Sequence, residues 1–311
     1  MNVELDRHWE NQSAVNEFVL LGFREHPMLF FAAFLAIYLT VLLGNGLVVI
    51  VTTRDPALHT PMYFFLRSLS GLEVCYTSVT LPRMISSLAT GDHSISLEAC
   101  ASQMFFLLFL GGAECFLLGA MSYDRYLAIC LPLRYMTIMN QRMLIGLVSG
   151  CFILSLPMQL VQIGLIFSLP FCGPHEMDHF FCDIPPVLSL ACADLYTNKL
   201  VVYMENVIFV LAPFVLILTS YVRITKTILH MPSVMGRRKA FSTCSSHVIV
   251  VSLFYGSAML VYLRPKTTDS IKVDKLLSLL YTVAIPLCNP LIYTLRNKEV
   301  KAALKRLLSN K

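Results

Sequence analysis

Long apolar stretches recur along the whole chain, and they constrain its fold more than any other feature of the sequence. An α-helix needs about 20 consecutive apolar residues to cross the hydrocarbon core of a bilayer. Four such stretches contain no Asp, Glu, Lys or Arg, namely 28–53, 143–174, 240–263 and 276–295. Three more contain only a few charged residues and lie near 61–83, 97–123 and 198–222. We therefore expect seven membrane-spanning helices and no separate soluble domain.

The composition agrees with a membrane protein: 56% of the residues are hydrophobic and only 14% are charged, whereas a soluble domain carries about 25% charged residues. The first 27 residues contain five acidic residues and no basic segment before a short apolar core, so no cleavable signal peptide is predicted and the first span should act as its own insertion signal. We predict an extracellular tail over 1–27, a bundle over 28–295, and a cytoplasmic segment over 296–311. The predicted spans are 28–53, 61–83, 97–123, 143–167, 198–222, 240–263 and 276–295.

Basic residues predict the orientation of these spans, because Lys and Arg are enriched in cytoplasmic loops. With the N-terminus outside, the cytoplasmic segments hold fifteen Lys and Arg residues and the extracellular segments hold eight. The acidic residues are distributed the opposite way. We therefore expect a plasma-membrane protein with its N-terminus outside and its C-terminus inside. The net charge of +5 reflects this topology and gives no reason to expect a nucleic-acid partner.

The run MSYDRYLAIC, residues 121–130, follows the third apolar stretch. Its Asp124 and Arg125 are adjacent where the chain leaves the membrane, so they can form an ion pair until a cytosolic partner binds the arginine. The competing interpretation is an arginine that only extends its charge to the interface, but a positioned acid is not needed for that.

The run at 121–130 closely resembles the signature of the odorant receptors, a branch of the rhodopsin-like G-protein-coupled receptors. The resemblance continues at matching places along most of the chain, in Gly44-Asn45, PMYFFL (61–66), KAFSTCSSH (239–247), FYG (254–256) and PLCNPLIY (286–293). Ser122 and Cys288 depart from the usual family residues, and both changes are small. The resemblance implies an all-α, rhodopsin-like bundle of seven transmembrane helices.

This resemblance also implies the function. Such a receptor binds small, largely apolar odorants in the outer half of the bundle and activates the stimulatory olfactory G protein, which raises cyclic AMP. We find no nucleophile–base arrangement, phosphate loop or metal motif that would suggest an enzyme, and we expect no cofactor. A receptor of the same mechanism with a non-olfactory role remains an alternative. A transporter is a weaker one, because neither internal repeats nor paired interrupted helices are visible.

Four cysteines fall on the predicted outer side, where disulfides persist, and they allow three pairings. The resemblance implies the pairs Cys100–Cys182 and Cys172–Cys192. The same loop contains His175, His179 and Cys182, which are residue types that bind zinc, but the disulfide would use Cys182. Asn11 begins an Asn-Gln-Ser glycosylation signal in the predicted outer tail, and we expect it to be modified.

Several residues are predicted to form a switch toward the cytoplasm. Pro290 removes a backbone donor inside a membrane helix, so neighbours such as Asn289 must repair that turn. The turn is a natural hinge, with Tyr293 one turn later, although a tolerated kink is an equal interpretation. By the resemblance, the switch residues are Asp124, Arg125, Tyr126, Tyr221, His247, Asn289, Pro290 and Tyr293.

Two carboxylic residues, Glu73 and Glu114, lie well inside the second and third spans. Ionisable residues at such depth usually face the bundle interior with a partner, and no basic residue lies at a matching depth. A proton or a cation such as sodium should therefore neutralise them. We interpret them as an inner polar site of the switch, with a purely structural hydrogen bond as the alternative.

The ligand cavity is expected among facing residues in the outer halves of spans three, five, six and seven, with apolar walls and a few polar groups. The candidates are Met104, Leu107, Leu108, Gly111, Gly112, Val202, Glu205, Asn206, Phe209, Tyr255, Ala258, Met259, Tyr262, Leu279 and Thr282. Glu205 is the one ionisable group among them. It would act either as a protonated donor to a carbonyl or alcohol odorant or as an anion that selects an amine, and the sequence favours neither.

Beyond Tyr293, apolar residues recur at helical spacing at Val300, Ala303, Leu304, Leu307 and Leu308, with basic residues on the other sides. This pattern predicts a short amphipathic helix in contact with the lipids of the inner leaflet.

Overall fold

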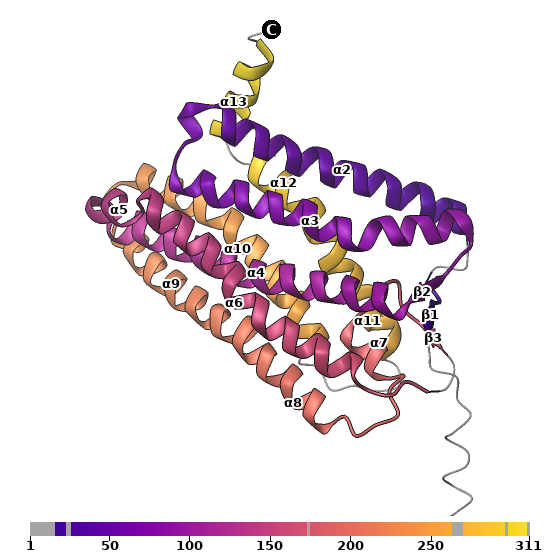
Figure 1. Cartoon of the computed structure of the whole chain (residues 1–311). Helices are drawn as coiled ribbons and strands as arrows, with labels where there is room; N and C mark the ends of the chain where they lie inside the picture. Colours follow the sequence, from indigo (N-terminus) through magenta and orange to yellow (C-terminus); the bar gives the residue numbers. More distant parts are fainter. Residues whose placement is uncertain (1–15, 23–25, 173–174, 263–269, 296–297, 310–311) are drawn as a thin grey trace, which may run out of the picture.

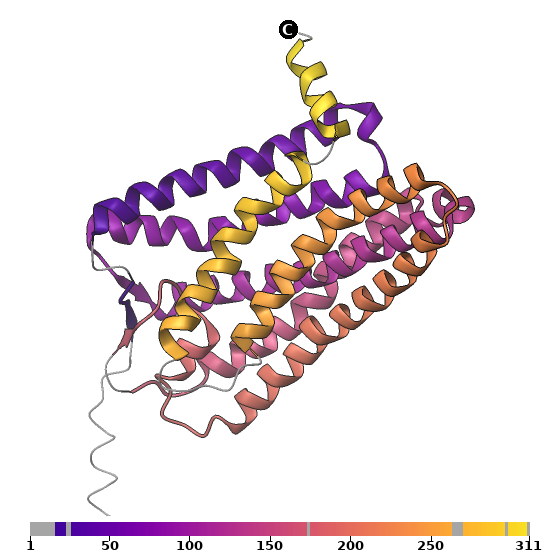
Figure 2. The same cartoon turned by 180° about the vertical axis from the view of Figure 1, so that it is seen from behind.

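The computed structural model describes residues 16–22, 26–172, 175–262, 270–295 and 298–309. Its long helices run side by side as an elongated bundle (Figure 1), with a small sheet at one end, called the sheet end below, and α13 at the opposite end, called the α13 end. The continuous bundle helices are α2 (Pro27–Arg54), α3 (Pro61–Thr90), α4 (Leu97–Cys130), α6 (Gln141–Phe167) and α10 (Val234–Tyr262). Two further spans each consist of two α-helices joined by a π-helical turn. The first contains α8 (Tyr196–Glu205), the turn η2 (Asn206–Leu211) and α9 (Ala212–Leu229). The second contains α11 (Ser270–Leu279), the turn η3 (Leu280–Ala284) and α12 (Ile285–Leu295). Figure 2 shows α10 and α12 beside each other on the back of the bundle.

The seven predicted spans are all helical, which confirms the expected fold class. Among the described residues, six helical segments are long and apolar enough to cross a membrane. The seventh, α3, is more polar because it buries Ser70, Glu73, Thr77 and Thr80 inside the bundle. Most helices extend beyond the apolar runs, α4 by seven residues past position 123, because the backbone continues its hydrogen bonds after the side chains become polar.

The helix ends follow local chemistry. Ser96 and Asn140 cap α4 and α6, where their side-chain oxygens accept hydrogen bonds from Ala99 N (3.2 Å) and Met143 N (3.0 Å). Gly91 ends α3 with φ of 74°, a left-handed conformation that glycine adopts without strain.

In the described part of the chain, the π-helical turns η2 and η3 each end two residues before a proline. A proline lacks the N–H of a helical turn, and its ring clashes with the carbonyl four residues earlier. Pro213 follows η2 and Pro286 follows η3, so each wide turn accommodates a proline. Such turns are frequent at functional sites, and η2 begins directly after Glu205.

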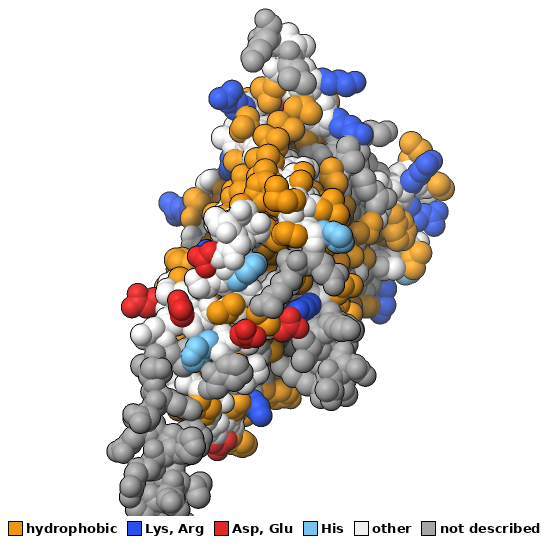
Figure 3. Space-filling model, turned by 90° about the vertical axis from the view of Figure 1, so that its right-hand side faces the viewer, with side chains coloured by type: hydrophobic (Ala, Val, Ile, Leu, Met, Phe, Trp, Pro, Cys, Tyr) orange, Lys and Arg blue, Asp and Glu red, His pale blue; other side chains and the backbone are white. Residues whose placement is uncertain are grey.

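Residues just before the first helix form the middle strand of the small sheet, which the sequence did not predict. Strand β1 (Glu17–Leu20) lies between β2 (Ser94–Ser96) and β3 (Glu176–Met177), antiparallel to β2 and parallel to β3. Phe18 and Leu20 alternate with more exposed residues and pack in an apolar cluster with Met104. Several acidic side chains and histidines are exposed on this face (Figure 3).

The disulfides also lie at the sheet end. Cys100 at the start of α4 is bonded to Cys182, and Cys172 is bonded to Cys192; these are the pairs that the resemblance implied. Cys100 and Cys182 are both fully buried. The first bond therefore joins α4 covalently to the loop that covers the bundle.

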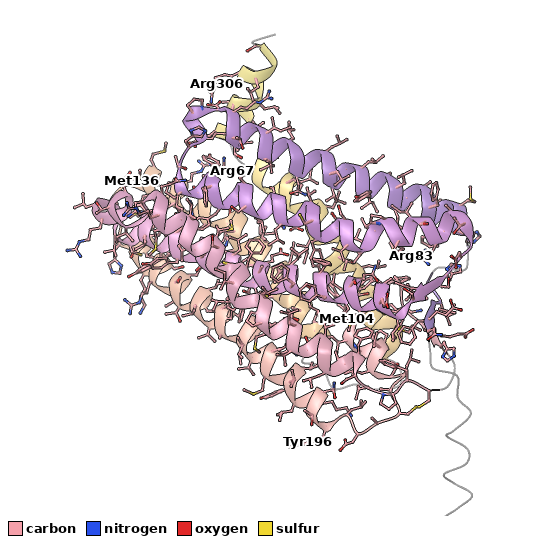
Figure 4. All side chains as sticks on the ribbon, viewed as in Figure 1. Arg67, Arg83, Met104, Met136, Tyr196 and Arg306 are labelled. Carbon is pink, nitrogen blue, oxygen red and sulfur yellow. A yellow bond between two sulfur atoms is a disulfide. The ribbon has the colours of Figure 1, made fainter. Side chains whose placement is uncertain are left out.

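At the opposite end, α5 (Pro132–Ile138), η1 (Pro56–Leu58) and α13 (Lys298–Ser309) surround the bundle. Figure 4 shows Met136 of α5 and Arg306 of α13 toward this end, while Arg83 and Met104 lie toward the other. Helix α13 leaves the bundle at a wide angle to α2 (Figure 1).

Helix α13 is amphipathic as predicted, but part of its apolar face contacts protein and not the lipid that we expected. Val300 and Ala303 are buried against Val51 and Leu58, so this part of the face contacts protein and not lipid. Arg306 binds Asp55 at 2.7 Å, and its guanidinium holds the pKa of that carboxyl below its usual value. The lipid-facing interpretation of the sequence pattern was therefore wrong for the first turns of the helix.

Candidate functional site

A small cavity of about 100 Å³ lies between α4, α6, the α8–η2 segment and α10. Its walls are mostly apolar, as is usual for sites that bind small organic molecules. Residues from the predicted set that line it are Leu107, Leu108, Gly111, Gly112, Val202, Glu205, Asn206, Phe209 and Ala258.

Other predicted ligand residues lie outside this lining. Met104 packs in the cluster at the sheet end. The Tyr255 hydroxyl donates to Cys115 O at 2.7 Å, which holds α10 against α4. Thr282 donates to Ser278 O within its own helix, and Met259 and Leu279 pack against the main core. The side chain of Tyr262 lies outside the described residues.

The sequence interpretation missed six lining residues: Cys115, Gln159, Ile184, Val210, Phe254 and Tyr281. Gln159 is the most informative, because it is a buried amide in the middle of α6. A polar side chain within an apolar span is costly unless it faces the bundle interior, so Gln159 and Gln162, one turn apart, were a usable signal. The fourth span contains none of the family motifs, so the resemblance gave no reason to include it among the ligand-binding spans.

Glu205 of α8 and Gln159 of α6 both line the cavity. Glu205 is 6% exposed and Gln159 is 3% exposed. Within the described part of the chain, neither Glu205 Oε1 nor Gln159 Oε1 has a hydrogen-bond partner. Asn206, the next residue to Glu205, donates to Val202 O of its own helix at 2.8 Å.

The floor of the cavity depends on Gly112. A Cβ atom there would lie 2.6 Å from Ser155 Oγ and 3.2 Å from the Phe209 ring. The Ser155 hydroxyl is held by a hydrogen bond to Phe109 O, so it cannot move without losing that bond. A side chain at this position would therefore force α4 and α6 apart.

We expect Gly112→Ala to destabilise the receptor by about 1–3 kcal/mol, the usual cost of overpacking a tight contact. Gly111→Ala is the matched control, because its new Cβ would meet only Tyr76 Cε2 at 3.7 Å, an ordinary contact. The midpoint of thermal unfolding in detergent should fall for the first variant and stay level or rise for the second. Equal midpoints for the two variants would contradict the tight contact.

A chain of polar side chains continues from the cavity region into the bundle. Glu73 of α3 and Glu114 of α4 are both buried and interact electrostatically with each other. The Asn289 amide of α12 donates a hydrogen bond to Glu73 Oε1. Polar side chains of α3, α4 and α12 therefore meet inside the bundle.

The repair of the turn at Pro290 differs from the prediction. Pro290 has no N–H to donate to Pro286 O, and the side chain of Asn45 on α2 donates to that carbonyl at 3.2 Å instead. Asn289, which we expected in this role, is engaged with Glu73. A Cβ at Gly44 would lie 3.2 Å from the Pro290 ring, so glycine lets α2 approach close enough for Asn45 to reach.

At the α13 end, the predicted switch residues of α4, α9 and α10 come together. Arg125 forms an ion pair with Asp124, and the Tyr135 hydroxyl of α5 donates to Asp124 Oδ1 at 2.8 Å. Burial beside Asp124 raises the pKa of the Tyr135 phenol, so it remains a donor. Tyr221 and His247 share a hydrogen bond of 2.6 Å and interact electrostatically with Arg125.

The remaining predicted switch residues are separate from this group. Tyr126 packs with Ile224 and Cys244, whereas Asn289 and Pro290 belong to the inner polar region. The side chain of Tyr293 lies outside the described residues.

The loop histidines do not form the metal site that the sequence pattern suggested as an alternative. Cys182 is used by the disulfide, and His179 Nδ1 is 2.9 Å from Phe181 O. Burial lowers the pKa of His179. Within the described ranges, His, Cys, Asp and Glu form no group suited to a metal ion.

A seven-helix bundle with a cavity among its helices, a disulfide from α4 to a loop at the sheet end, and an Asp-Arg-Tyr triplet toward the α13 end is the architecture of a G-protein-coupled receptor. The sequence profile of the olfactory receptor family matches residues 34–311. The chain is 51% identical over 305 residues to human olfactory receptor 10A7, covering 97% of this chain and 96% of that protein. It is 52% identical over 299 residues to human olfactory receptor 10C1, covering 95% and 96%.

The chain therefore belongs to the olfactory receptor family. It is a multi-pass membrane protein and a receptor, not an enzyme.

Proposed function

We propose that this receptor binds small, largely apolar odorants in the cavity between α4, α6, η2 and α10, and that occupancy activates the stimulatory olfactory G protein and raises cyclic AMP. The observation that carries the proposal is the shared helix α4. Gly112 of the cavity and Arg125 of the switch lie on this one helix, about 20 Å apart at 1.5 Å per residue. A small shift of α4 at one site is thereby felt at the other.

The sheet end faces the outside and the α13 end faces the cytoplasm in this proposal. Support comes from the excess of Lys and Arg in the segments around the α13 end. The two disulfides at the sheet end suit an oxidising compartment. Asn11, the expected glycosylation site, precedes the described residues. The basic flanks of α13 would contact the lipids of the inner leaflet.

In the resting state, Asp124 holds Arg125 and is itself held by Tyr135 of α5. Activation releases Arg125 toward the G protein while α10, which carries His247, moves away from α9. The inner polar site, Glu73 and Glu114, couples the two ends through Asn289 of α12. Because Pro290 leaves a backbone carbonyl that a side chain of another helix must satisfy, this part of α12 can bend at low cost.

The direct test is a panel of chemically varied odorants applied to cells that express the receptor, with cyclic AMP as the readout. At least one compound is expected to raise cyclic AMP in a dose-dependent way. Ionic current or solute uptake without cyclic AMP would contradict receptor function and favour the transporter alternative.

Tyr135→Phe is expected to raise ligand-independent cyclic AMP about 5- to 10-fold. The substitution removes one polar contact of Asp124 and keeps the ring, and part of the roughly 1.5–3 kcal/mol of a hydrogen bond to a charged group then favours the active state. Tyr123→Phe is the control, since Tyr123 is 37% exposed on the neighbouring helix face. An unchanged basal level at equal surface expression would show that the Tyr135 contact does not restrain the resting state.

A further inference from the structure

Two buried acceptor oxygens belong to residues that line the same cavity, and neither has a donor. Glu205 Oε1 and Gln159 Oε1 are both buried and, among the described residues, both lack a hydrogen-bond partner. The described residues that line the cavity include no Lys, Arg or His. Buried polar atoms are nearly always satisfied in native structures, so the missing donor is expected to come from a molecule that enters the cavity.

The carboxyl of Glu205 determines what kind of donor is needed. A buried carboxylate without a cation costs several kcal/mol, and the amide of Asn206, the next residue in the chain, is already bonded to its own helix. An ammonium group supplies both a positive charge and up to three N–H donors. It is therefore able to satisfy Glu205 and Gln159 at the same time.

We propose that the agonist is a small aliphatic amine whose ammonium group binds between Glu205 and Gln159 while its hydrocarbon part contacts Leu107, Phe209 and Phe254. This rests on the proposed function, in which the same cavity receives the odorant. Glu205, the last residue of α8, supplies the counter-ion, and Gln159 of α6 supplies a neutral acceptor. The ligand is thereby held between α6 and α8, which pack against each other.

The size of the cavity limits the ligand. One water needs about 10–15 Å³ on the same measure, so about 100 Å³ admits at most roughly seven to ten non-hydrogen atoms. Amines such as 3-methylbutylamine and cyclohexylamine are within this limit. Gly112 cannot be enlarged without a clash with Ser155 and Phe209, so larger ligands would require the walls to move.

A carbonyl odorant satisfies the site less well. It offers acceptors only, so Glu205 would have to be protonated and Gln159 Oε1 would keep no donor. Rotation of the Gln159 amide by 180° exchanges its oxygen for its nitrogen, but Glu205 has no such freedom. The preference for an amine therefore comes mainly from Glu205, and Gln159 adds a second contact.

The test compares three molecules with one carbon skeleton: 3-methylbutylamine, 3-methylbutanol and 3-methylbutanal. In the purified full-length receptor, the amine is expected to raise the midpoint of thermal unfolding and the two neutral compounds are not. Glu205→Gln should remove this stabilisation, whereas Glu98→Gln, at an exposed acid near the sheet end, should retain it. In cells, the potency of the amine should fall at least about tenfold in Glu205→Gln, the scale of one charge-assisted contact.

The outcomes separate this inference from the proposed function. Stabilisation by the alcohol or aldehyde equal to that by the amine would overturn the ligand class, even if all three compounds raise cyclic AMP. The ligand class would also be overturned if neither 3-methylbutylamine nor cyclohexylamine stabilised the receptor. Stabilisation by the amine without cyclic AMP would support the ligand class and contradict the coupling. If Glu205→Gln does not fold, the comparison of the three compounds on the unaltered receptor still decides.

Discussion

Cys100→Ser, and equally Cys182→Ser, is expected to lower the amount of receptor at the cell surface at least about tenfold. The disulfide closes a loop with a sequence separation of 82 residues, for which the chain-entropy model gives about 4–5 kcal/mol of stabilisation. That figure is an upper value here, because insertion in the membrane already restricts the unfolded chain. Surface labelling of intact cells with an antibody against an N-terminal tag measures the effect.

The loss has a structural reason beyond loop closure. Both cysteines are fully buried in the cluster that also contains Phe18 and Met104, and Cys182 N donates to Gln103 Oε1 at 3.0 Å. Without the bond, the loop that carries this hydrogen bond is no longer held on α4. Cys75→Ser is the control, since Cys75 is a free, exposed cysteine of α3. Normal surface levels for Cys100→Ser would show that the packing alone suffices.

Arg125→Ala is expected to leave surface expression near normal and to abolish the cyclic AMP response to any agonist. Arg125 does not line the cavity, and its ion pair with the adjacent Asp124 lies at the α13 end. Its side chain is 11% exposed, so in the proposed function activation must uncover it for the G protein. The response is measured at matched surface expression.

Two further variants sharpen this test. Arg125→Lys keeps the charge but loses the planar group with its fixed donors, and it should restore only a small part of the response. Arg142→Ala removes an exposed positive charge at the α13 end and should signal normally. A near-native response of Arg125→Ala would reduce this arginine to a determinant of membrane topology.

The sequence alone was sufficient for the number and order of the spans. Each apolar run must be long enough to cross the hydrocarbon core, and in that solvent only a helix satisfies its own backbone groups. The motifs were sufficient for the family, and the resemblance implied the two disulfide pairs that the structure contains. All these features are encoded locally, in single runs or in short motifs.

Features that depend on two distant segments were not predictable in this way. The acceptor for Asn45 is a carbonyl 241 residues away, and the strand formed by residues 17–20 exists only because two later segments pair with it. Likewise, the apolar face of α13 was visible as a pattern, but nothing in that pattern distinguishes a protein surface from lipid.

The cavity shows most clearly which features the sequence predicts and which depend on the tertiary structure. The sequence identified Glu205 as an unusual acid in an apolar span, because a charge there is costly wherever the helix points. It did not identify Gln159 as a second polar group of the cavity, and it left the chemistry of the ligand open. Only the packing of α6 against α8 brings both side chains to one cavity and decides which polar atoms lack a donor, because hydrogen bonding is satisfied between helices and the sequence describes one helix at a time.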